Sequence, residues 1–187
     1  MLQHLYFIRH GETAWSLTGQ YTGRTDLPLI AAGEEGGRKL AARLSTVSFS
    51  RVFTSPRQRA RQTCALAGFG AVAEIEPDLA EWDYGDYEGL RRDEILRRQP
   101  DWNIYRDGCP QGESPAAITA RVDGLIDRLR GLEGNIAVFS HGHLGRVLAA
   151  RWIGLPIADG QRFVLGTASV SVLGFEHDAP VIMHWNT

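Results

Sequence analysis

The stretch Leu5-Tyr6-Phe7-Ile8-Arg9-His10-Gly11-Glu12-Thr13 changes abruptly from four apolar residues to a cation, an imidazole, a glycine and a carboxylate. A short apolar run of this kind is typical of a strand that is covered on both faces of a sheet. In open α/β sheets, ligands bind beyond the carboxyl ends of such strands. The pattern predicts a buried strand that places Arg9 and His10 at a ligand site. For an Arg-His pair alone, the start of a solvated loop explains the residues equally well.

The length and composition of the chain predict one soluble domain that spans residues 1–187. Of its 187 residues, 43% are hydrophobic, and no Pro/Gly/Ser-rich linker or charge block divides them. No apolar run is long enough to cross a bilayer, so we expect no membrane partner. The Met1-Leu2-Gln3-His4 start lacks the cationic and apolar regions of a secretory signal, which favours a cytoplasmic location.

Charge and cysteine content narrow the choice of function further. The formal net charge of −2 argues against a general nucleic-acid-binding protein, whose phosphate contacts require a basic surface. The two cysteines, Cys64 and Cys109, are too few for a disulfide framework or a cysteine-based zinc site, so we expect reduced thiols.

A second short strand is predicted at Val52-Phe53-Thr54, and a helix is predicted directly after it. Ser55 suits the N-cap and Pro56 the first helical position. This places free N–H groups at the carboxyl end of a strand, where an anion can bind and an arginine one turn later can reach it. Three arginines follow at spacings that diverge on a helix, so we expect two of the three to be solvated: Arg57, Arg59 and Arg61.

A third strand, Ile136-Ala137-Val138-Phe139, ends in Ser140-His141-Gly142-His143 and repeats the opening pattern. Apolar residues at helical spacing continue to about Gly154, so His141 is predicted to lie between a strand end and a helix start. The His-x-His pair is also a fair zinc half-site. We rate zinc lower, because the accompanying arginines repel a cation.

An acidic and aromatic segment, Asp78 to Gly89, offers a general acid. A carboxylate that is held against Trp and Tyr rings loses hydration, which favours its protonated form. The composition of the segment does not show which carboxylate has this role, and an acidic surface loop explains most of them.

The remaining segments complete an α/β pattern. Helices are predicted from Gly33 to Leu44 and after the Ser114-Pro115 capping signal, and two final strands from Thr167 to Phe175 and from Val181 to Trp185. The last strand could be the edge of a homodimer or a covered edge. Long polar loops, which could cover a pocket, are predicted at residues 15–29 and 102–114.

Together these residues suit phosphoryl transfer. A neutral imidazole at His10 can attack phosphorus and form a phosphohistidine if cations neutralise the phosphate oxygens. Arginine pairs with two phosphate oxygens at once, and nearby arginines also disfavour the protonated form of His10. Glu81 would protonate the leaving oxygen and then accept a proton from the attacking water.

Four blocks of the sequence, in the usual order, resemble the histidine phosphatase, or phosphoglycerate mutase-like, superfamily. The resemblance implies a three-layer α/β/α sandwich with a mostly parallel central sheet. It also implies His10 as the phosphorylated nucleophile and Glu81 as the proton donor. The Arg/His constellation predicts that no metal ion or other cofactor is needed. The blocks are Arg9-His10-Gly11-Glu12, Ser55 with Arg59-Ala60, Leu79-Ala80-Glu81-Trp82-Asp83-Tyr84-Gly85 and Ser140-His141-Gly142.

The resemblance implies further site residues. Arg9, Arg59 and His141 would form the phosphate pocket. The chain looks most similar to a bacterial acid phosphatase branch and to a sedoheptulose-bisphosphatase branch. By that likeness Tyr21, Thr22, Tyr84, His143 and Arg146 are candidates for substrate contact. Further phosphate or substrate contacts are expected at Ser16, Gly23, Ser55 and Gly142.

The expected function is a metal-independent phosphatase that hydrolyses small phosphomonoesters such as sugar phosphates. A phosphoglycerate mutase is the alternative, and a non-catalytic phosphate-binding module is the third hypothesis. The resemblance disfavours the mutase, because Ser16 stands where true mutases carry an asparagine and because the chain lacks their long insertion and tail. An open pocket admits water, which favours hydrolysis of the phosphohistidine. Ile30 replaces a common hydroxyl cap, which predicts a weakly capped helix after it.

Overall fold

The apolar run at the start of the chain forms strand β1 (Leu2–Arg9) in the centre of a six-stranded sheet. The structure is a computed structural model that describes residues 2–187; Met1, the first residue of the predicted domain, lies outside the described residues. The other strands are β2 (Phe49–Thr54), β3 (Glu74–Ile75), β4 (Gly134–Ser140), β5 (Val170–Glu176) and β6 (Ala179–His184).

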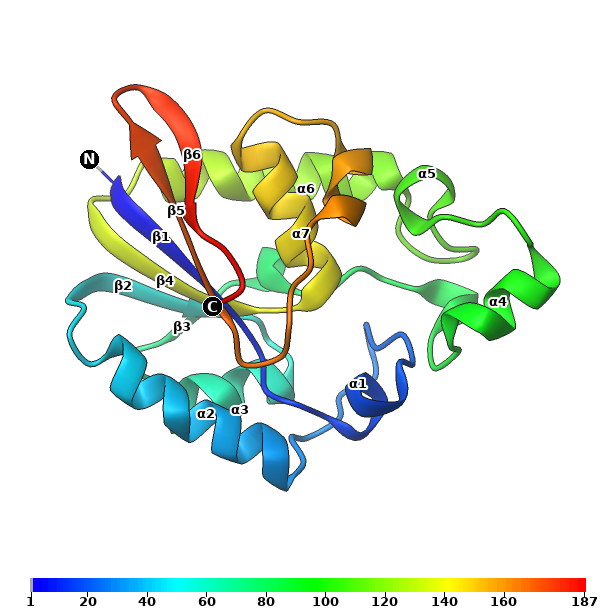
Figure 1. Ribbon diagram of the computed structural model, residues 1–187, viewed down its shortest axis with the longest axis horizontal. Coiled ribbons are helices and arrows are strands. Elements are labelled where there is room, and N and C mark those ends of the chain that lie inside the picture. The colour runs from blue at the N-terminus through cyan, green and yellow to red at the C-terminus, as the bar shows by residue number, and fades with distance from the viewer. Residues whose placement is uncertain (1) are drawn as a thin grey trace.

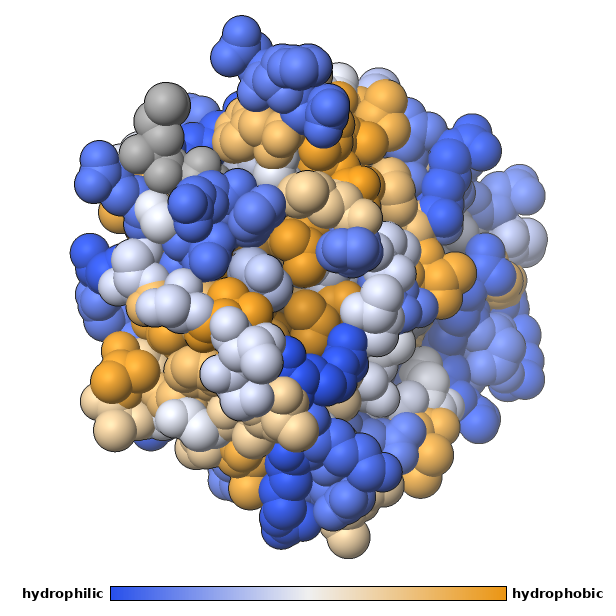
Figure 2. All heavy atoms as spheres, turned by 60° about the vertical axis from the view of Figure 1, so that its left-hand side comes forward, coloured by the Kyte–Doolittle hydropathy of each residue, from blue (hydrophilic) through white to orange (hydrophobic). Residues whose placement is uncertain are grey.

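The sheet is mostly parallel, as predicted. Its strand order is β3-β2-β4-β1-β5-β6, in which β3, β2, β4 and β1 pair in parallel and β5 and β6 are joined by antiparallel pairing. Because β6 is the outer strand, one of its edges is not paired within residues 2–187. In Figure 2, which turns the left-hand side of Figure 1 forward, hydrophobic residues are interspersed with hydrophilic ones on the visible face.

Helices cover both faces of the sheet, so the three-layer prediction is confirmed (Figure 1). Successive side chains of a strand lie on opposite faces of the sheet. Phe7 therefore lies on the face covered by α6 and α7, and Ile8 lies on the face covered by α2 and α3. The α-helices are α1 (Ala14–Thr18), α2 (Ala31–Leu44), α3 (Gln58–Leu66), α4 (Arg92–Arg98), α5 (Ile104–Asp107), α6 (Pro115–Arg130) and α7 (Gly142–Trp152). Three short 3₁₀ helices are η1 (Pro77–Leu79), η2 (Gly85–Tyr87) and η3 (Ile157–Arg162).

The predicted start of the second helix is wrong by two residues. Helix α3 begins at Gln58, and Ser55 is not its N-cap. The carboxylate of Asp26, from the preceding loop, accepts a hydrogen bond from the backbone N–H of Gln58 at 2.7 Å. The Ser55 hydroxyl instead accepts a hydrogen bond from the N–H of Arg57 at 3.3 Å and also contacts a distant part of the chain.

The predicted arginine exposures are only partly correct. Arg59 is fully buried and Arg61 is exposed, but Arg57 is partly buried rather than solvated. The cap at Ser114 is confirmed, since its hydroxyl accepts a hydrogen bond from the N–H of Ala117 at 3.1 Å. Ile30 provides no side-chain cap to α2, also as predicted.

The two predicted loops contain short helices. Helix α1 lies at the start of the first loop and α5 lies in the second. None of the helices in residues 2–187 has the length and apolar character needed to cross a membrane.

Candidate active site

Three neighbouring strands bring residues from distant parts of the sequence to one edge of the sheet. In the parallel pair of β1 and β4, Arg9 is opposite Ser140, so the residues that follow each strand, His10 and His141, lie side by side. Their ring centroids are 5.2 Å apart. Ser55 follows β2 on the other side of β4, and its N–H donates to the carbonyl of Phe139 at 2.9 Å.

His10 is held as a neutral imidazole with a defined proton position. Its Nδ1 atom lies 2.7 Å from the carbonyl oxygen of Gly11. A carbonyl can only accept a hydrogen bond, so Nδ1 carries the ring proton and Nε2 carries the lone pair. Burial, and then the charges of Arg59 and Arg9, lower the pKa of His10 well below its ordinary value. Nε2 of His10 is thus prepared for nucleophilic attack.

His141 is oriented by Ser55. The Ser55 hydroxyl oxygen lies 2.7 Å from Nε2 of His141, and the imidazole is completely buried. Its other nitrogen, Nδ1, is also buried and has no hydrogen-bond partner in the described part of the chain. Burial lowers the pKa of His141 well below its ordinary value, and Arg59 adds to this effect. The unpartnered Nδ1 is the atom left to meet a ligand oxygen.

Arg9 and Arg59 flank His10 in different ways. Arg9 lines the cavity in front of His10 and donates a hydrogen bond to the carbonyl of Leu165. Arg59 is fully buried, and its Nη atoms donate to carbonyl oxygens of the preceding loop, those of Thr22 at 2.9 Å and Thr25 at 3.0 Å. The Nε atoms of both arginines are buried without a partner among residues 2–187. Both guanidinium groups therefore retain hydrogen-bonding capacity.

The loop that contacts Arg59 is also held by a carboxylate. Glu88 accepts hydrogen bonds from the N–H groups of Gly23, at 2.9 Å, and Thr25, at 3.0 Å. A Cβ atom at Gly23 would lie 2.5 Å from the carbonyl oxygen of Trp82, so only glycine fits there. The loop carbonyls thus face Arg59 while its amides face Glu88.

Glu81 binds the amino end of helix α7. Its Oε2 accepts from the N–H of His143 at 3.0 Å, and its Oε1 accepts from the N–H of Leu144 at 2.8 Å and of Trp82 at 3.0 Å. Burial raises the pKa of Glu81, but the interaction with His143 and the three N–H donors outweigh it, so the pKa lies below its ordinary value. The prediction that aromatic surroundings favour the protonated form of a carboxyl group in this segment therefore does not hold for Glu81.

A cavity of about 410 Å³ opens in front of His10. Ten of the predicted site residues line it: Arg9, His10, Ser16, Tyr21, Thr22, Glu81, Tyr84, Gly142, His143 and Arg146. Four others are buried and are not among the lining residues: Gly23, Ser55, Arg59 and His141.

Eight lining residues were not predicted as site residues: Gly19, Gln20, Arg92, Trp102, Asn103, Ile104, Tyr105 and Gln161. Those in the two polar loops could have been found from the expectation that the loops cover a pocket. Arg92, at the start of α4, and Gln161, in η3, carry no such signal.

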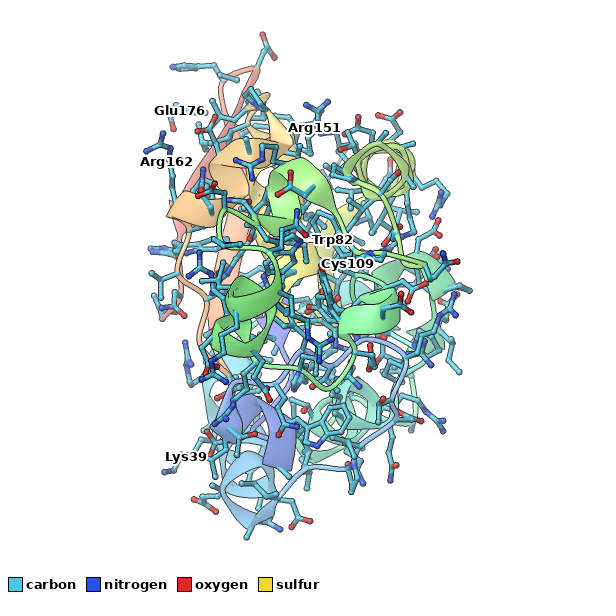
Figure 3. The ribbon with its side chains drawn as sticks, turned by 90° about the vertical axis from the view of Figure 1, so that its right-hand side faces the viewer. Lys39, Trp82, Cys109, Arg151, Arg162 and Glu176 are labelled. Carbon is cyan, nitrogen blue, oxygen red and sulfur yellow. The ribbon has the colours of Figure 1, made fainter. Side chains whose placement is uncertain are left out.

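Aromatic rings form one side of the cavity. The ring centroid of Tyr21 lies 4.9 Å from that of Tyr84 and 5.6 Å from that of Trp102. In Figure 3, Trp82 and Cys109 lie in the middle of the view, whereas Lys39 and Arg162 lie at its periphery. Trp82 is buried beneath the wall, where its indole N–H donates to the carbonyl of Glu113 at 2.8 Å.

The chain is similar to known proteins over most of its length. The family model of the histidine phosphatase superfamily (branch 1) matches residues 5–187. The chain is 41% identical to an acid phosphatase of Mycobacterium tuberculosis over 177 residues, which cover 92% of this chain and 87% of the relative. It is 40% identical to sedoheptulose 1,7-bisphosphatase of Saccharomyces cerevisiae over 184 residues, which cover 80% of this chain and 67% of the relative.

A solved structure shares the whole fold. The structure of an open reading frame product from Mycobacterium tuberculosis superposes with a TM-score of 0.92 at 37% sequence identity. The match covers 98% of this chain and 97% of that chain.

Proposed function

The chain belongs to the histidine phosphatase superfamily and is a phosphoric monoester hydrolase, and from this premise we propose that it acts without a metal ion through a phosphohistidine at His10. The observation that carries this proposal is the hydrogen bond between Nδ1 of His10 and the Gly11 carbonyl. It leaves the lone pair on Nε2, which is the form that can attack phosphorus.

The proposed reaction has two steps. Nε2 of His10 forms a bond to phosphorus while the bond from phosphorus to the ester oxygen breaks, and that oxygen takes a proton from Glu81. Water then attacks the phosphohistidine, gives a proton to the Glu81 carboxylate, and releases phosphate. Glu81 must be protonated before the first step. A bound phosphate dianion raises its pKa, because a nearby negative charge disfavours a carboxylate.

The phosphate oxygens would be neutralised by the groups that surround His10. Arg9 and Arg59 each have a buried Nε without a partner in the described part of the chain, and His141 has a free Nδ1. Donors that are already oriented stabilise the charge of the transition state without reorganisation. These roles of Arg9, Arg59 and His141 remain part of the proposal.

For the substrate, we propose sugar phosphates, including those with a second phosphate group. Arg92 and Arg146 line the cavity, and neither forms an ion pair with a carboxylate in residues 2–187. Among the described residues, Glu81 is the one acidic residue on the cavity wall. Unpaired guanidinium groups in such a wall favour an anion. One relative with 40% identity is named as a sedoheptulose 1,7-bisphosphatase.

The test of the function uses a chromogenic phosphate ester in excess EDTA. We expect hydrolysis to proceed with EDTA and to fall at least about 10³-fold in His10→Ala, because the covalent intermediate cannot form. Activity that requires an added divalent metal ion, or that persists in His10→Ala, would contradict the proposal. An assay of 3-phosphoglycerate with a bisphosphate primer tests the mutase alternative, which predicts isomerisation faster than hydrolysis.

The test of the second phosphate compares a mono- and a bisphosphate of the same sugar. We expect Arg92→Gln to lower kcat/KM for the bisphosphate about tenfold more than for the monophosphate. Arg98→Gln is the matched control, because Arg98 lies on the same helix, is exposed, and does not line the cavity. Equal effects of Arg92→Gln on both substrates would contradict this part of the proposal.

A cytoplasmic location and a homodimer stay predictions. Both cysteines, Cys64 and Cys109, are buried free thiols, which agrees with a reducing compartment. Strand β6 lies at the sheet edge, and Met183 on it is 43% exposed. Cell fractionation tests the location, and sedimentation analysis tests the oligomeric state.

A further inference from the structure

Tyr84 and His143 form a hydrogen-bonded pair in the cavity wall. The Tyr84 hydroxyl oxygen lies 2.8 Å from Nδ1 of His143. Tyr84 is only 2% exposed, whereas His143 is partly buried. The backbone N–H of His143 donates to Oε2 of Glu81, so the imidazole is attached beside the proposed proton donor.

The pair determines which ring nitrogen of His143 carries the proton. Burial raises the pKa of Tyr84 well above its ordinary value, so the phenol keeps its proton. Nδ1 of His143 is the one hydrogen-bond partner of this hydroxyl among residues 2–187, and a buried O–H without an acceptor costs free energy. Tyr84 therefore donates to Nδ1. A neutral imidazole has one N–H group, which must then be on Nε2.

The Nε2–H group of His143 is free to meet a ligand. Aromatic rings surround the imidazole, with centroids 5.5 Å away for Tyr21, 5.7 Å for Tyr84 and 5.8 Å for Tyr105. No described side chain or backbone group accepts a hydrogen bond from Nε2, although His143 lines the cavity.

The ring is neutral at working pH. Burial lowers the pKa of His143 to about 4, and the charges of Arg146 and Arg9 also lower it, against the opposing charge of Glu81. His143 therefore adds no positive charge to a cavity that already contains arginines. A neutral N–H donor suits an uncharged oxygen acceptor better than a second phosphate group.

We propose that His143 binds the substrate by donating its Nε2–H to a hydroxyl group of the leaving alcohol, and that Tyr84 is a positioning residue that fixes this tautomer. This assignment rests on the proposed phosphatase function, since it concerns the alcohol part of the same ester. It specifies the substrate class as esters of polyhydroxylated alcohols, whose faces can also pack on the aromatic wall.

Two substitutions at His143 distinguish the effect of losing the hydrogen-bond donor at Nε2 from the effect of losing the imidazole ring. A glutamine amide reaches the position of Nε2, whereas an asparagine amide reaches only that of Nδ1. We would measure KM and kcat for a hexose phosphate and for phenyl phosphate, whose leaving group has no further hydroxyl. A net hydrogen bond of about 0.5–1.5 kcal/mol corresponds to a change of about two- to tenfold.

The expected result is a selective loss in one variant. His143→Asn should raise the ratio of KM for hexose phosphate to KM for phenyl phosphate about fivefold. In His143→Gln this ratio should return most of the way to the wild-type value. An equal loss with both substrates, or a glutamine variant no better than the asparagine variant, would overturn the assignment of His143.

Tyr84→Phe tests the tautomer directly. Heteronuclear NMR of the imidazole nitrogens should show Nδ1 of His143 unprotonated in the wild type and a mixture of tautomers in Tyr84→Phe. KM for the hexose phosphate should rise about threefold with kcat nearly unchanged. Tyr87→Phe is the matched control, because the buried Tyr87 donates its hydroxyl to Gln99 Oε1 at 3.0 Å and does not line the cavity.

The outcomes distinguish this assignment from the proposed function. A proton on Nδ1 of His143 in the wild type would overturn the tautomer assignment, even if the enzyme hydrolyses both esters. A wild-type protein that hydrolyses neither ester in EDTA would contradict the proposed phosphatase function itself.

Discussion

Glu81 caps helix α7: its Oε1 accepts a hydrogen bond from the backbone N–H of Leu144 at 2.8 Å. The side chain proposed to move the proton therefore also satisfies free N–H groups at a helix start, where a negative charge is favourable. Chemistry and stability are coupled at this one carboxylate.

Glu81→Gln should reduce both activity and stability. The amide cannot donate the catalytic proton, which should lower kcat about 10²- to 10⁴-fold. Its NH₂ group would also face a backbone N–H, so the free energy of unfolding should fall by about 1–2 kcal/mol. Urea unfolding and steady-state kinetics measure the two effects. An inactive variant of unchanged stability would show that the cap contributes nothing.

The pH–rate profile should have its optimum on the acid side. The lowered pKa of His10 keeps the nucleophile neutral well below its ordinary titration range, and Glu81, whose pKa is also lowered, gains its proton only toward acid pH. kcat/KM should therefore decline as pH rises through neutrality. A rate that increases steadily into the alkaline range would contradict both assignments.

Stability should decrease in acid because of His143. The pKa of His143 is about 4 in the folded state, below its value in the unfolded state. The contribution of the neutral imidazole to the free energy of unfolding is therefore complete above about pH 6.5 and is lost as pH falls toward 4. This loss amounts to roughly 3 kcal/mol. Urea unfolding at neutral pH and near pH 4.5 should show a smaller decrease for His143→Gln than for the wild type. Identical decreases would indicate that His143 is not buried in its neutral form.

Gly33→Ala should disturb the loop that carries His10. A Cβ atom at Gly33 would lie 2.1 Å from the carbonyl oxygen of Glu12, which follows Gly11. The clash should cost about 1–3 kcal/mol of stability and displace the Gly11 carbonyl that orients His10. Activity and thermal unfolding report the change.

Gly124→Ala is the matched control for that substitution. It lies within helix α6, and its Cβ would meet only an Arg128 Nη atom, at 3.7 Å. We expect this variant to gain about 0.5–1 kcal/mol and to retain activity. Equal behaviour of the two variants would contradict a close approach at Gly33.

Glu88→Gln should loosen the loop of Thr22 to Thr25. The substitution weakens the hydrogen bonds that Glu88 accepts from Gly23 and Thr25, and with them the carbonyl contacts of Arg59. KM should rise about tenfold, with a smaller change in kcat. Asp86→Asn, at an exposed position of the 3₁₀ helix η2, which Glu88 directly follows, should leave KM unchanged. A wild-type KM in Glu88→Gln would show that the loop keeps its position without the charge.

Local sequence patterns predict five of the six strands, the four longest α-helices and the chemical character of the site, but not the two-residue strand β3 or the short helices α1, α4 and α5. The apolar runs before Arg9-His10 and before Ser140-His141 predict buried strands, because the period of side chains along a strand is a local property. The cap at Ser114 can also be predicted from the local sequence, since the two residues that form it are three positions apart.

How these segments interact depends on tertiary contacts. The parallel register of β1 and β4 places His10 beside His141, although 131 residues separate them. The pKa of Glu81 is lowered by N–H groups of a helix that begins about sixty residues later. This effect outweighs burial, which raises the pKa and was expected from the aromatic neighbours of Glu81. The proton position on His143 likewise depends on Tyr84, across 59 residues. Local sequence composition does not predict such contacts, because residues that are far apart in the sequence can be neighbours in the fold.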